Sequence, residues 1–253
     1  MFSLLNYDGN SDALLPDGTQ HGVVVRCIPN SEGHGVGFAE GHNRIFRHTE
    51  PHDCFVLLNP DCIPQAGSID ALLARYATDA TIALVEGRQW PFEHPKEYDS
   101  LTLQTPWASG AFCLIKSEFY KSIGGMDELY FLYLEDVDLS WQAWLSGYQV
   151  LYEPSAAVIH FTGGRFYRRD LVSNESFYSL RNFLIISRKF FGKEGEARAR
   201  SMLRKMHDRQ LITVAMRQYD LIDPLMIDGR YIDKTHRKVK IVGCNQFHEM
   251  RSK

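Results

Sequence analysis

One apolar run and the turn that follows it constrain the fold of this chain more than any other feature. Residues 53–58 read Asp-Cys-Phe-Val-Leu-Leu, and Asn59-Pro60-Asp61 follows directly. A run that is apolar at successive positions is typical of a strand buried between two layers of helices. Sheets of that kind bind ligands just beyond the carboxyl ends of their strands. The run therefore predicts an α/β protein with a ligand site near Asp61.

Strand-like and helical patterns alternate along most of the chain. They predict strands over 23–28, 53–58, 81–86, 111–116, 148–152 and 156–161, and helices over 35–48, 67–76 and 136–146. Residues 87–106 are predicted to form a long loop. From 172 to 219 the pattern is helical, with a break near Gly192 and Gly195. We therefore expect a domain over 1–170 that carries the sheet, C-terminal helices over 171–220 packed on it, and a polar tail over 221–253 without assigned structure.

Composition excludes several classes of protein. The 253 residues include 44% hydrophobic and 23% charged side chains, which are ordinary globular values. The net charge of −3 argues against a general nucleic-acid binder, which would be basic. The five cysteines form no CxxC pair, which is typical of free thiols in a reducing compartment. Without a leader or an apolar run of about 18 residues, we expect a cytoplasmic protein whose membrane contact is at most peripheral.

The Asn59-Pro60-Asp61 turn is the first segment that could carry chemistry. Pro60 cannot continue the strand, so Asp61 is pushed into the space beyond its end. A carboxylate there can hold a divalent cation, and the cation can hold a diphosphate. The alternative is a plain turn, because Asn, Pro and Asp all favour turns.

Five acidic residues gather within a short aromatic stretch. They are Asp127, Glu128, Glu135, Asp136 and Asp138. Asp136 is predicted to start the 136–146 helix, with Glu135 just before it. Acids in that place cap a helix and complement its dipole, by roughly 0.3–1 kcal/mol each. One cap needs a single Asp, however, and a carboxylate at the mouth of a partly buried site can act as a general base on a hydroxyl. Both interpretations stay open on the residues alone.

Two further segments gain meaning only from their surroundings. His160 ends the apolar run Val158-Ile159, where a hydrogen-bonded core histidine is the usual interpretation and a metal ligand the other. Residues 107–111 read Trp-Ala-Ser-Gly-Ala ahead of a predicted strand. The small residues allow a ligand to approach the backbone closely, but they also suit an ordinary junction between loop and strand.

Taken in order, these segments resemble the family 2 glycosyltransferases, especially the branch of rhamnosyltransferases and galactofuranosyltransferases. The resemblance covers roughly residues 22–192. Its motifs are Leu58-Asn59-Pro60-Asp61, Ser109-Gly110-Ala111, Gly124-Gly125-Met126-Asp127-Glu128, the stretch from Phe131 to Leu139 with Glu135-Asp136-Val137-Asp138 in it, Gly147-Tyr148, Pro154, Ala156 and His160. Each motif is weak by itself, whereas the ordered set is specific.

The resemblance implies a GT-A fold, meaning a Rossmann-like, mostly parallel sheet flanked by helices, and inversion at the anomeric carbon. It implies that Asp61 and His160 contact a metal and that Asp136 is the catalytic base. On the acceptor side it implies Asp127 and Glu128, and we expect Glu135 and Trp107 beside them. The donor-side residues that we expect are Asn43, Asn59, Asp61, Ser109, Gly110, Ala111 and Arg165.

General chemistry supports the same roles. Departure of a nucleoside diphosphate builds negative charge on the leaving oxygen, which Mn²⁺ or Mg²⁺ stabilises without proton transfer. Oxygen ligands with one imidazole suit these ions better than a softer metal. We expect a nucleotide-diphosphate sugar as donor, a glycan or lipid-linked acceptor in surface polysaccharide synthesis, and no nucleic-acid partner.

Two departures from the family pattern favour an alternative function. Asn59 replaces the first carboxylate of the family's DxD-like motif, and the first strand–helix unit is predicted to be missing. The alternative is a truncated, non-catalytic GT-A domain that binds a nucleotide sugar or acts as a scaffold. A nucleotidyltransferase is disfavoured, because the start of the chain has no Gly-rich phosphate loop with Lys or Arg.

The stretch over 181–209 is rich in basic residues, with aromatic and aliphatic residues between them. The basic residues are Arg181, Arg188, Lys189, Lys193, Arg198, Arg200, Arg204, Lys205 and Arg209. A basic amphipathic stretch can dock on an anionic membrane surface, which would suit a lipid-linked acceptor. A solvated helix face packed on the catalytic domain is the other interpretation.

Overall fold

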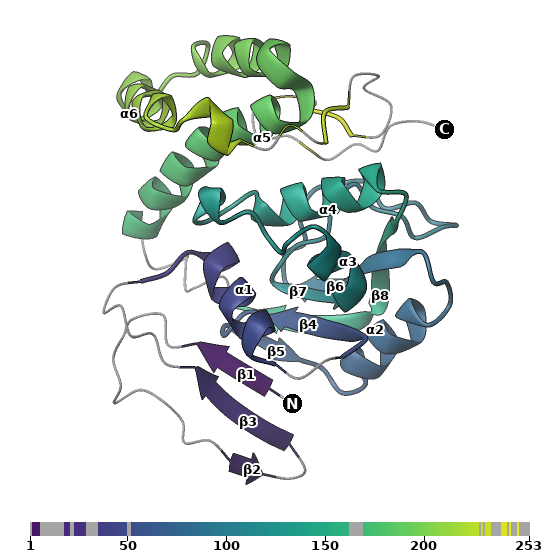
Figure 1. Ribbon diagram of the computed structural model, residues 1–253. Coiled ribbons are helices and arrows are strands. Elements are labelled where there is room, and N and C mark those ends of the chain that lie inside the picture. The colour runs from purple at the N-terminus through teal and green to yellow at the C-terminus, as the bar shows by residue number, and fades with distance from the viewer. Residues whose placement is uncertain are drawn as a thin grey trace.

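A five-stranded sheet forms the centre of the molecule (Figure 1). The computed structural model describes residues 2–5, 18–20, 23–28, 35–49, 52–161, 169–227, 229, 231–233, 239–241, 243 and 247, with side chains from residue 35 onward except those of 169–176. The strands of the sheet are β4 (Cys54–Leu58), β5 (Cys62–Pro64), β6 (Ile82–Trp90), β7 (Phe112–Lys116) and β8 (Gln149–His160), in the spatial order β4-β7-β6-β8-β5.

The α/β class is confirmed, but the sheet is mixed where a mostly parallel one was expected. Only β6 and β8 are parallel, and the other three neighbouring pairs are antiparallel. The long loop over 91–111 brings the chain back as β7 beside β6, and an antiparallel neighbour needs no crossover helix. β5 is a short strand that directly follows the turn after β4.

Helices cover both faces of this sheet. They are α1 (Phe38–His48), α2 (Ser68–Tyr76), α3 (Ser117–Ser122) and α4 (Glu135–Leu145). Leu84 of β6 and Ile115 of β7 pack in one cluster with residues of α1, α3 and α4. Their sequence neighbours Val85 and Leu114 pack on the opposite face with Leu72 of α2. Burial on both faces explains why these strands read as continuous apolar runs.

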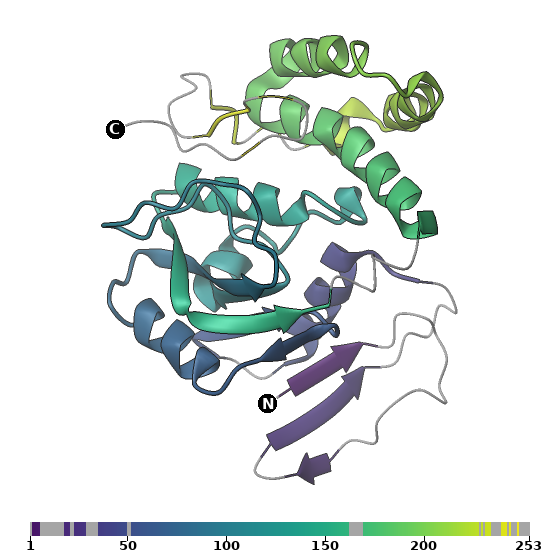
Figure 2. The ribbon, with the colours of Figure 1, turned by 180° about the vertical axis from the view of Figure 1, so that it is seen from behind.

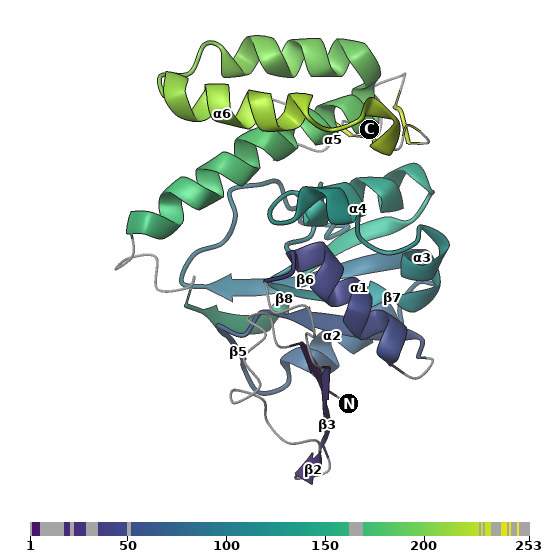
Figure 3. The ribbon, with the colours of Figure 1, turned by 60° about the vertical axis from the view of Figure 1, so that its left-hand side comes forward.

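Two C-terminal helices form a further layer over α4 (Figure 3). They are α5 (Arg169–Leu203) and α6 (Arg209–Asp220), and α5 bends at Gly192, whose φ is 66°. Trp141 of α4 packs edge-on against Phe190 and Phe191 of α5. The contact supports packing of these helices on the sheet domain, while the domain limits at 170 and 220 stay predictions. Among the described residues, no helix combines the length and apolarity needed to cross a bilayer.

The described residues before α1 form a separate three-stranded sheet. Its strands are β1 (Phe2–Leu5), β2 (Gly18–Gln20) and β3 (Val23–Ile28), in the order β1-β3-β2, with β1 and β3 parallel. In Figure 1 and Figure 2 this sheet lies below the main one. The sequence analysis predicted β3 but neither β1 nor β2.

The remaining predicted elements are found, with three differences. β6 runs to Trp90, so residues 87–90 of the predicted loop are strand. The strands expected over 148–152 and 156–161 are one strand, β8, in which residues after Glu153 bulge while the pairing with β6 resumes at Ala157. A bulge admits Pro154 without ending the strand. The short elements β5, α3 and the 3₁₀ helices η2 (Glu128–Tyr130) and η4 (Pro224–Met226) were not predicted.

Candidate active site

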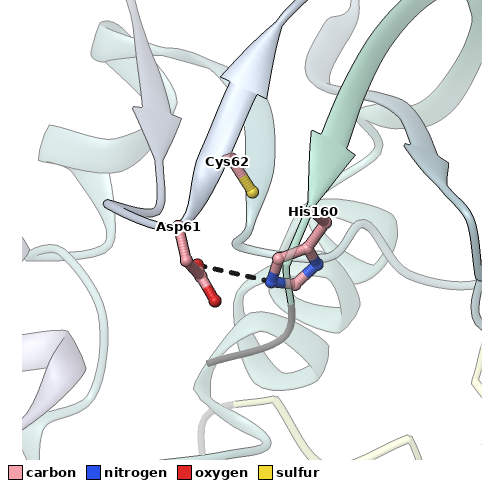
Figure 4. A group of neighbouring side chains, drawn as sticks. All are labelled: Asp61, Cys62 and His160. Carbon is pink, nitrogen blue, oxygen red and sulfur yellow. Dashed lines mark ion pairs between the residues drawn. The ribbon is translucent and has the colours of Figure 1, made fainter. Parts of the chain in front are cut away.

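Asp61 and His160 face each other from neighbouring strands. Asp61 lies in the turn between β4 and β5, and His160 ends β8. β5 and β8 are antiparallel with Cys62 opposite His160, and the Phe161 N–H donates to the Asp61 carbonyl (3.0 Å). This pairing brings Asp61 Oδ1 within 3.5 Å of His160 Nε2 (Figure 4). The sequence prediction that these two side chains meet is therefore matched by the geometry.

The geometry of this pair fits a shared divalent cation. Ligands of one ion lie about 2.1 Å from it, hence roughly 3–4 Å from each other. The 3.5 Å between Asp61 Oδ1 and His160 Nε2 lies in that range. His160 Nδ1 is 2.8 Å from Gln89 Oε1 on β6, so the ring donates its Nδ1 proton to Gln89 and turns the Nε2 lone pair towards Asp61. A metal-binding histidine needs this tautomer.

Cys62 is the third residue of this cluster with a potential ligand atom. The ligand atoms of Asp61, Cys62 and His160 lie within 4.8 Å of one another. Burial, followed by the charge of Asp61, raises the pKa of the Cys62 thiol to about 12. A neutral thiol is a poor ligand for hard ions such as Mn²⁺ and Mg²⁺. The protein ligands that suit these ions are therefore Asp61 and His160.

Asp136 lies in the first turn of α4, where two N–H groups hold its carboxylate. Oδ1 accepts from the Val137 N–H (2.8 Å) and Oδ2 accepts from the Gly110 N–H (3.2 Å). Burial raises the pKa of Asp136, while the Gly110 N–H and the charge of Lys96 oppose that rise. A held carboxylate with a raised pKa is well suited to accept a proton from a hydroxyl.

Two hydrogen bonds, both donated by main-chain N–H groups, connect the Asp61 turn to the Asp136 carboxylate. The Asn59 N–H donates to the Ala111 carbonyl (2.9 Å), and the preceding residue, Gly110, donates to Asp136 (3.2 Å). A Cβ on Gly110 would lie 3.0 Å from the Phe38 ring and 3.7 Å from Asp136 Cβ. Glycine therefore permits this close approach. The three sequence motifs meet where β4 ends and β7 begins.

Glu135 is buried beside Asp136 without a hydrogen-bond partner for one oxygen. Its side chain is 5% exposed, and Oε2 has no partner among the described residues. Burial and then the charge of Asp136 raise the pKa of Glu135 well above its ordinary value. The raised pKa favours the protonated carboxyl, which can donate a hydrogen bond to a ligand.

The loop before α4 has a strained backbone. Phe131, Tyr133 and Leu134 have positive φ angles of 60°, 68° and 70°. This region costs a residue with a side chain on the order of 1 kcal/mol or more. The Phe131 carbonyl accepts from the N–H of Phe38 (2.7 Å), and a Cβ on Gly37 would lie only 2.5 Å from that oxygen. The start of α1 thus packs directly on the loop.

Two adjacent residues of α5 hold this loop in place. Asn182 Nδ2 donates to the carbonyls of residues 130, 132 and 133, at 2.9, 2.7 and 2.7 Å. Arg181 Nη2 donates to the carbonyls of residues 129 and 130, at 2.9 and 2.6 Å. Asn182 is fully buried. No role was predicted for Asn182, and Arg181 was predicted only as part of a basic stretch.

Asn43 uses its polar atoms on internal contacts. It donates to the Met126 carbonyl (2.8 Å) and to Glu128 Oε1 (2.9 Å), and it accepts from the Met126 N–H (3.0 Å) and the Tyr120 hydroxyl. These four bonds use the whole capacity of the amide. Asn43 therefore braces the segment that carries Glu128, and its predicted donor role stays a prediction.

Asp127 belongs to a buried ionic network with α5. Its Oδ2 lies 2.8 Å from Lys189 Nζ, and its Oδ1 accepts from the Leu129 N–H (3.0 Å). The same ammonium lies 2.8 Å from Asp138 Oδ2, which also accepts from the Tyr130 hydroxyl (2.8 Å). Lys189 is 2% exposed and so belongs to the core. The acceptor role of Asp127 stays a prediction.

The loop over 91–111 adds a buried ion pair that the sequence analysis missed. Lys96 Nζ lies 2.7 Å from Glu86 Oε2 and donates to the Trp107 carbonyl (2.6 Å). Trp107 Nε1 is buried and has no partner among the described residues. A lysine in a loop carries no periodic signal, so the sequence alone does not indicate its burial.

The structure says less about three other residues that were predicted to contact the donor. Ser109 and Ala111 are buried in the segment next to Asp136. Arg165 lies outside the described residues. The donor roles of all three stay predictions.

The architecture is that of the GT-A glycosyltransferase fold. The solved structure of GalNAc-T7 with UDP, GalNAc and Mn²⁺ matches 78% of this chain and 43% of its own, with a TM-score of 0.53 and 14% identity. At that identity the likeness concerns the fold alone, and it confirms the expected one.

Sequence relatives then specify the branch. A relative from Mycobacterium tuberculosis, N-acetylglucosaminyl-diphospho-decaprenol L-rhamnosyltransferase, is 26% identical over 202 residues, covering 62% of this chain and 65% of the relative. Rhamnosyltransferase WbbL of Escherichia coli is 33% identical over 67 residues, covering 26% of this chain and 25% of the relative. No family model matches. The resemblance to the rhamnosyltransferase branch is thereby confirmed, although the chain spans less than two thirds of these relatives.

Proposed function

We propose that this protein is an inverting glycosyltransferase that moves a sugar from a nucleotide diphosphate to a hydroxyl of a glycan or lipid-linked acceptor in surface polysaccharide synthesis. The observation that carries the proposal is the pair Asp61–His160, joined through two backbone hydrogen bonds to the Asp136 carboxylate. An acceptor attached to a lipid diphosphate agrees with the name of the mycobacterial relative.

On the donor side, Asp61 and His160 would hold Mn²⁺ or Mg²⁺. When bound, the ion balances the negative charge of the leaving diphosphate. Gln89 keeps the His160 ring in the tautomer that leaves Nε2 unprotonated. The buried Ser109-Gly110-Ala111 segment would form one wall of the sugar site, because its small side chains leave room beside Asp136.

On the acceptor side, Asp136 takes the proton of the attacking hydroxyl. The Gly110 and Val137 N–H groups orient the carboxylate, and its raised pKa increases its affinity for that proton. The raised pKa of Glu135 favours its protonated form, which can donate a hydrogen bond to the acceptor. Attack from the face opposite the diphosphate inverts the anomeric centre.

The function is tested by incubating the protein with a panel of nucleotide-diphosphate sugars and Mn²⁺, followed by NMR of the product's anomeric proton. We expect transfer with inversion from one donor. Asp136→Asn should lower the rate by at least about a hundredfold while calorimetry shows donor binding unchanged. Asp70→Asn, an exposed change on α2, is the control. Transfer retained in Asp136→Asn would reject this role.

A non-catalytic nucleotide-sugar-binding domain is the second candidate, favoured by Asn59 in place of a carboxylate. It predicts that no donor in the panel is turned over, although one binds. The transfer assay separates the two cases, because calorimetry with nucleoside diphosphates and Mn²⁺ should show binding unchanged by Asp136→Asn in either case.

We further propose that the protein works on the cytoplasmic side of a membrane and that the end of α6 contacts the bilayer. Leu221, Leu225 and Met226 are 78%, 91% and 67% exposed, and Arg209 and Arg217 are exposed on α6. Apolar side chains beside cations suit an anionic lipid surface.

Flotation with vesicles of phosphatidylglycerol and phosphatidylcholine tests this contact. Binding should be lost in Leu221→Ser/Leu225→Ser and kept in Leu101→Ser, a change at another exposed leucine. Absence of wild-type binding at low salt would reject the contact.

A further inference from the structure

Lys96 is fully buried in the loop that passes behind the site. The exposure of its side chain is 0%, and that of its partner Glu86 is 2%. Its Nζ lies 2.7 Å from Glu86 Oε2, donates to the Trp107 carbonyl (2.6 Å) and lies 3.6 Å from the centre of the Trp107 ring. Burial lowers the pKa of Lys96, and the charge of Glu86 opposes that fall. The carbonyl and the aromatic face also favour the charged ammonium form. Burying this charge is costly, so the position calls for an explanation beyond packing.

The residues that Lys96 holds lead directly to Asp136. From Trp107 the chain continues to Ala108, whose N–H donates to Ser140 Oγ on α4 (3.0 Å). Two residues later the Gly110 N–H donates to Asp136 Oδ2 (3.2 Å). The segment 107–110 thus lies between the ammonium group and the carboxylate. Displacing it would remove one of the two N–H groups that orient Asp136.

We propose that Lys96 is a positioning residue of the site: held by Glu86, it fixes the 107–110 segment against α4 and presents a buried positive charge to the Asp136 carboxylate. This inference rests on the proposed function in so far as Asp136 is the base. Lys96 belongs to none of the motifs described in the sequence.

The charges around Asp136 predict opposite effects for the two members of the pair. Ionisable groups face Asp136 from three elements: Lys96 from the loop, Glu86 of β6 and Cys113 of β7, in addition to its neighbour Glu135. Burial raises the pKa of Asp136 and the charge of Lys96 opposes the rise. Removing the ammonium should therefore raise the pKa of Asp136, and neutralising Glu86 should lower it.

Carboxyl NMR measures the change in the pKa of Asp136 without any substrate. The protein is labelled with ¹³C at the aspartate side-chain carboxyl, and the Asp136 signal is identified by its loss in Asp136→Asn. We expect its titration midpoint to rise by on the order of one pH unit in Lys96→Met and to fall in Glu86→Gln. Lys121→Met, an exposed lysine on α3, is the matched control and should leave the midpoint unchanged.

The opposite signs separate a charge effect from loss of structure. If Lys96→Met fails to fold, the fall expected in Glu86→Gln still decides the question. A midpoint unchanged in Glu86→Gln, or shifted in the same direction in both variants, would overturn the proposal. The titration needs no turnover, so a protein that transfers no sugar would disprove the proposed function and leave this result standing. With an active donor, the acid limb of the kcat/KM profile should move with the midpoint.

Discussion

Gln89 orients the His160 ring in the way that the proposed cation site requires. Its Oε1 lies 2.8 Å from His160 Nδ1, which leaves Nε2 to face Asp61. Without that acceptor the ring can rotate or change tautomer, and an outer-shell partner of this kind contributes about 10–100-fold to metal affinity.

Gln89→Leu should therefore weaken Mn²⁺ binding about tenfold or more, as measured by electron paramagnetic resonance of free Mn²⁺ in the presence of UDP, GDP or dTDP. Asp61→Ala should abolish the binding that the nucleotide promotes. Asp70→Ala is the control for loss of surface charge. Equal Mn²⁺ affinity in wild type and Gln89→Leu would contradict the orientation of His160 inferred above.

Glu135 makes stability depend on pH with a definite sign. Because its pKa is raised in the folded state, the folded protein binds its proton more tightly than the unfolded chain does. Stability is then lost as the pH rises above about 4.3, the ordinary value for glutamate, towards the folded pKa. Glu135→Gln keeps the shape and removes the titration.

From pH 5 to pH 8, the unfolding free energy of wild type should fall relative to that of Glu135→Gln, by about 1–3 kcal/mol in total. Urea unfolding at several pH values gives this difference. Glu118→Gln, whose side chain is 77% exposed, should show no such trend. Parallel pH curves for wild type and Glu135→Gln would show that Glu135 is ionised in the folded protein.

The side chains proposed to react could be predicted from sequence better than the groups that hold them. Asp61, His160 and Asp136 lie in motifs with a fixed order, and the fold brings the first two within 3.5 Å. Gln89 and Lys96 carry no such signal, because their contacts depend on which strand or loop lies next to them. Asn43 is the opposite case. The resemblance implied a donor contact, but the structure shows that its amide already makes four hydrogen bonds inside the protein.

At the scale of elements, the loop over 129–134 depends on α5 for its shape. Three of its residues have positive φ, and Asn182 binds three of its carbonyls. Without this amide, buried carbonyls lose their donor and the strained backbone can relax, which moves the start of α4.

Asn182→Ala should lower the unfolding free energy by about 2–3 kcal/mol, and the amides of 129–137 should exchange hydrogen faster. Urea unfolding and hydrogen exchange read by mass spectrometry measure the two effects. Ser201→Ala, an exposed change on the same helix, should produce neither. Unchanged exchange over 129–137 would mean that other contacts hold the loop.

The elements themselves were predictable where burial imposes a pattern. β4 and β7 read as apolar runs because Leu114 and Ile115 each have a helix-covered face to fill. Strand order carries no local pattern, so the antiparallel insertion of β7 between β4 and β6 could not be predicted. β5 has three residues, too few for any periodicity, yet it aligns Asp61 with His160.

At the scale of the whole molecule, the C-terminal helices share one core with α4. Trp141 and Val137 of α4 belong to the same buried cluster as Phe183 and Phe190 of α5 and Ile212 of α6. A shared core couples the two layers, so they should unfold together.

Phe190→Ala should cost about 3–5 kcal/mol and shift both the far-UV and the tryptophan fluorescence transitions to the same lower urea concentration. Leu101→Ala, at a residue 89% exposed, should shift neither. Two separate transitions in Phe190→Ala would show that the helical layer and the sheet are independent folding units.

The main-chain link from Asn59 through Ala111 and Gly110 to Asp136 has a consequence for how such proteins diversify. Both hydrogen bonds are donated by main-chain N–H groups, which every residue type except proline has, so this link does not depend on the side chains of Asn59 and Ala111, although position 110 needs glycine. Replacements around the sugar can then change which hexose fits without altering the line along which the hydroxyl approaches. Specificity and reactivity are in this way free to evolve separately.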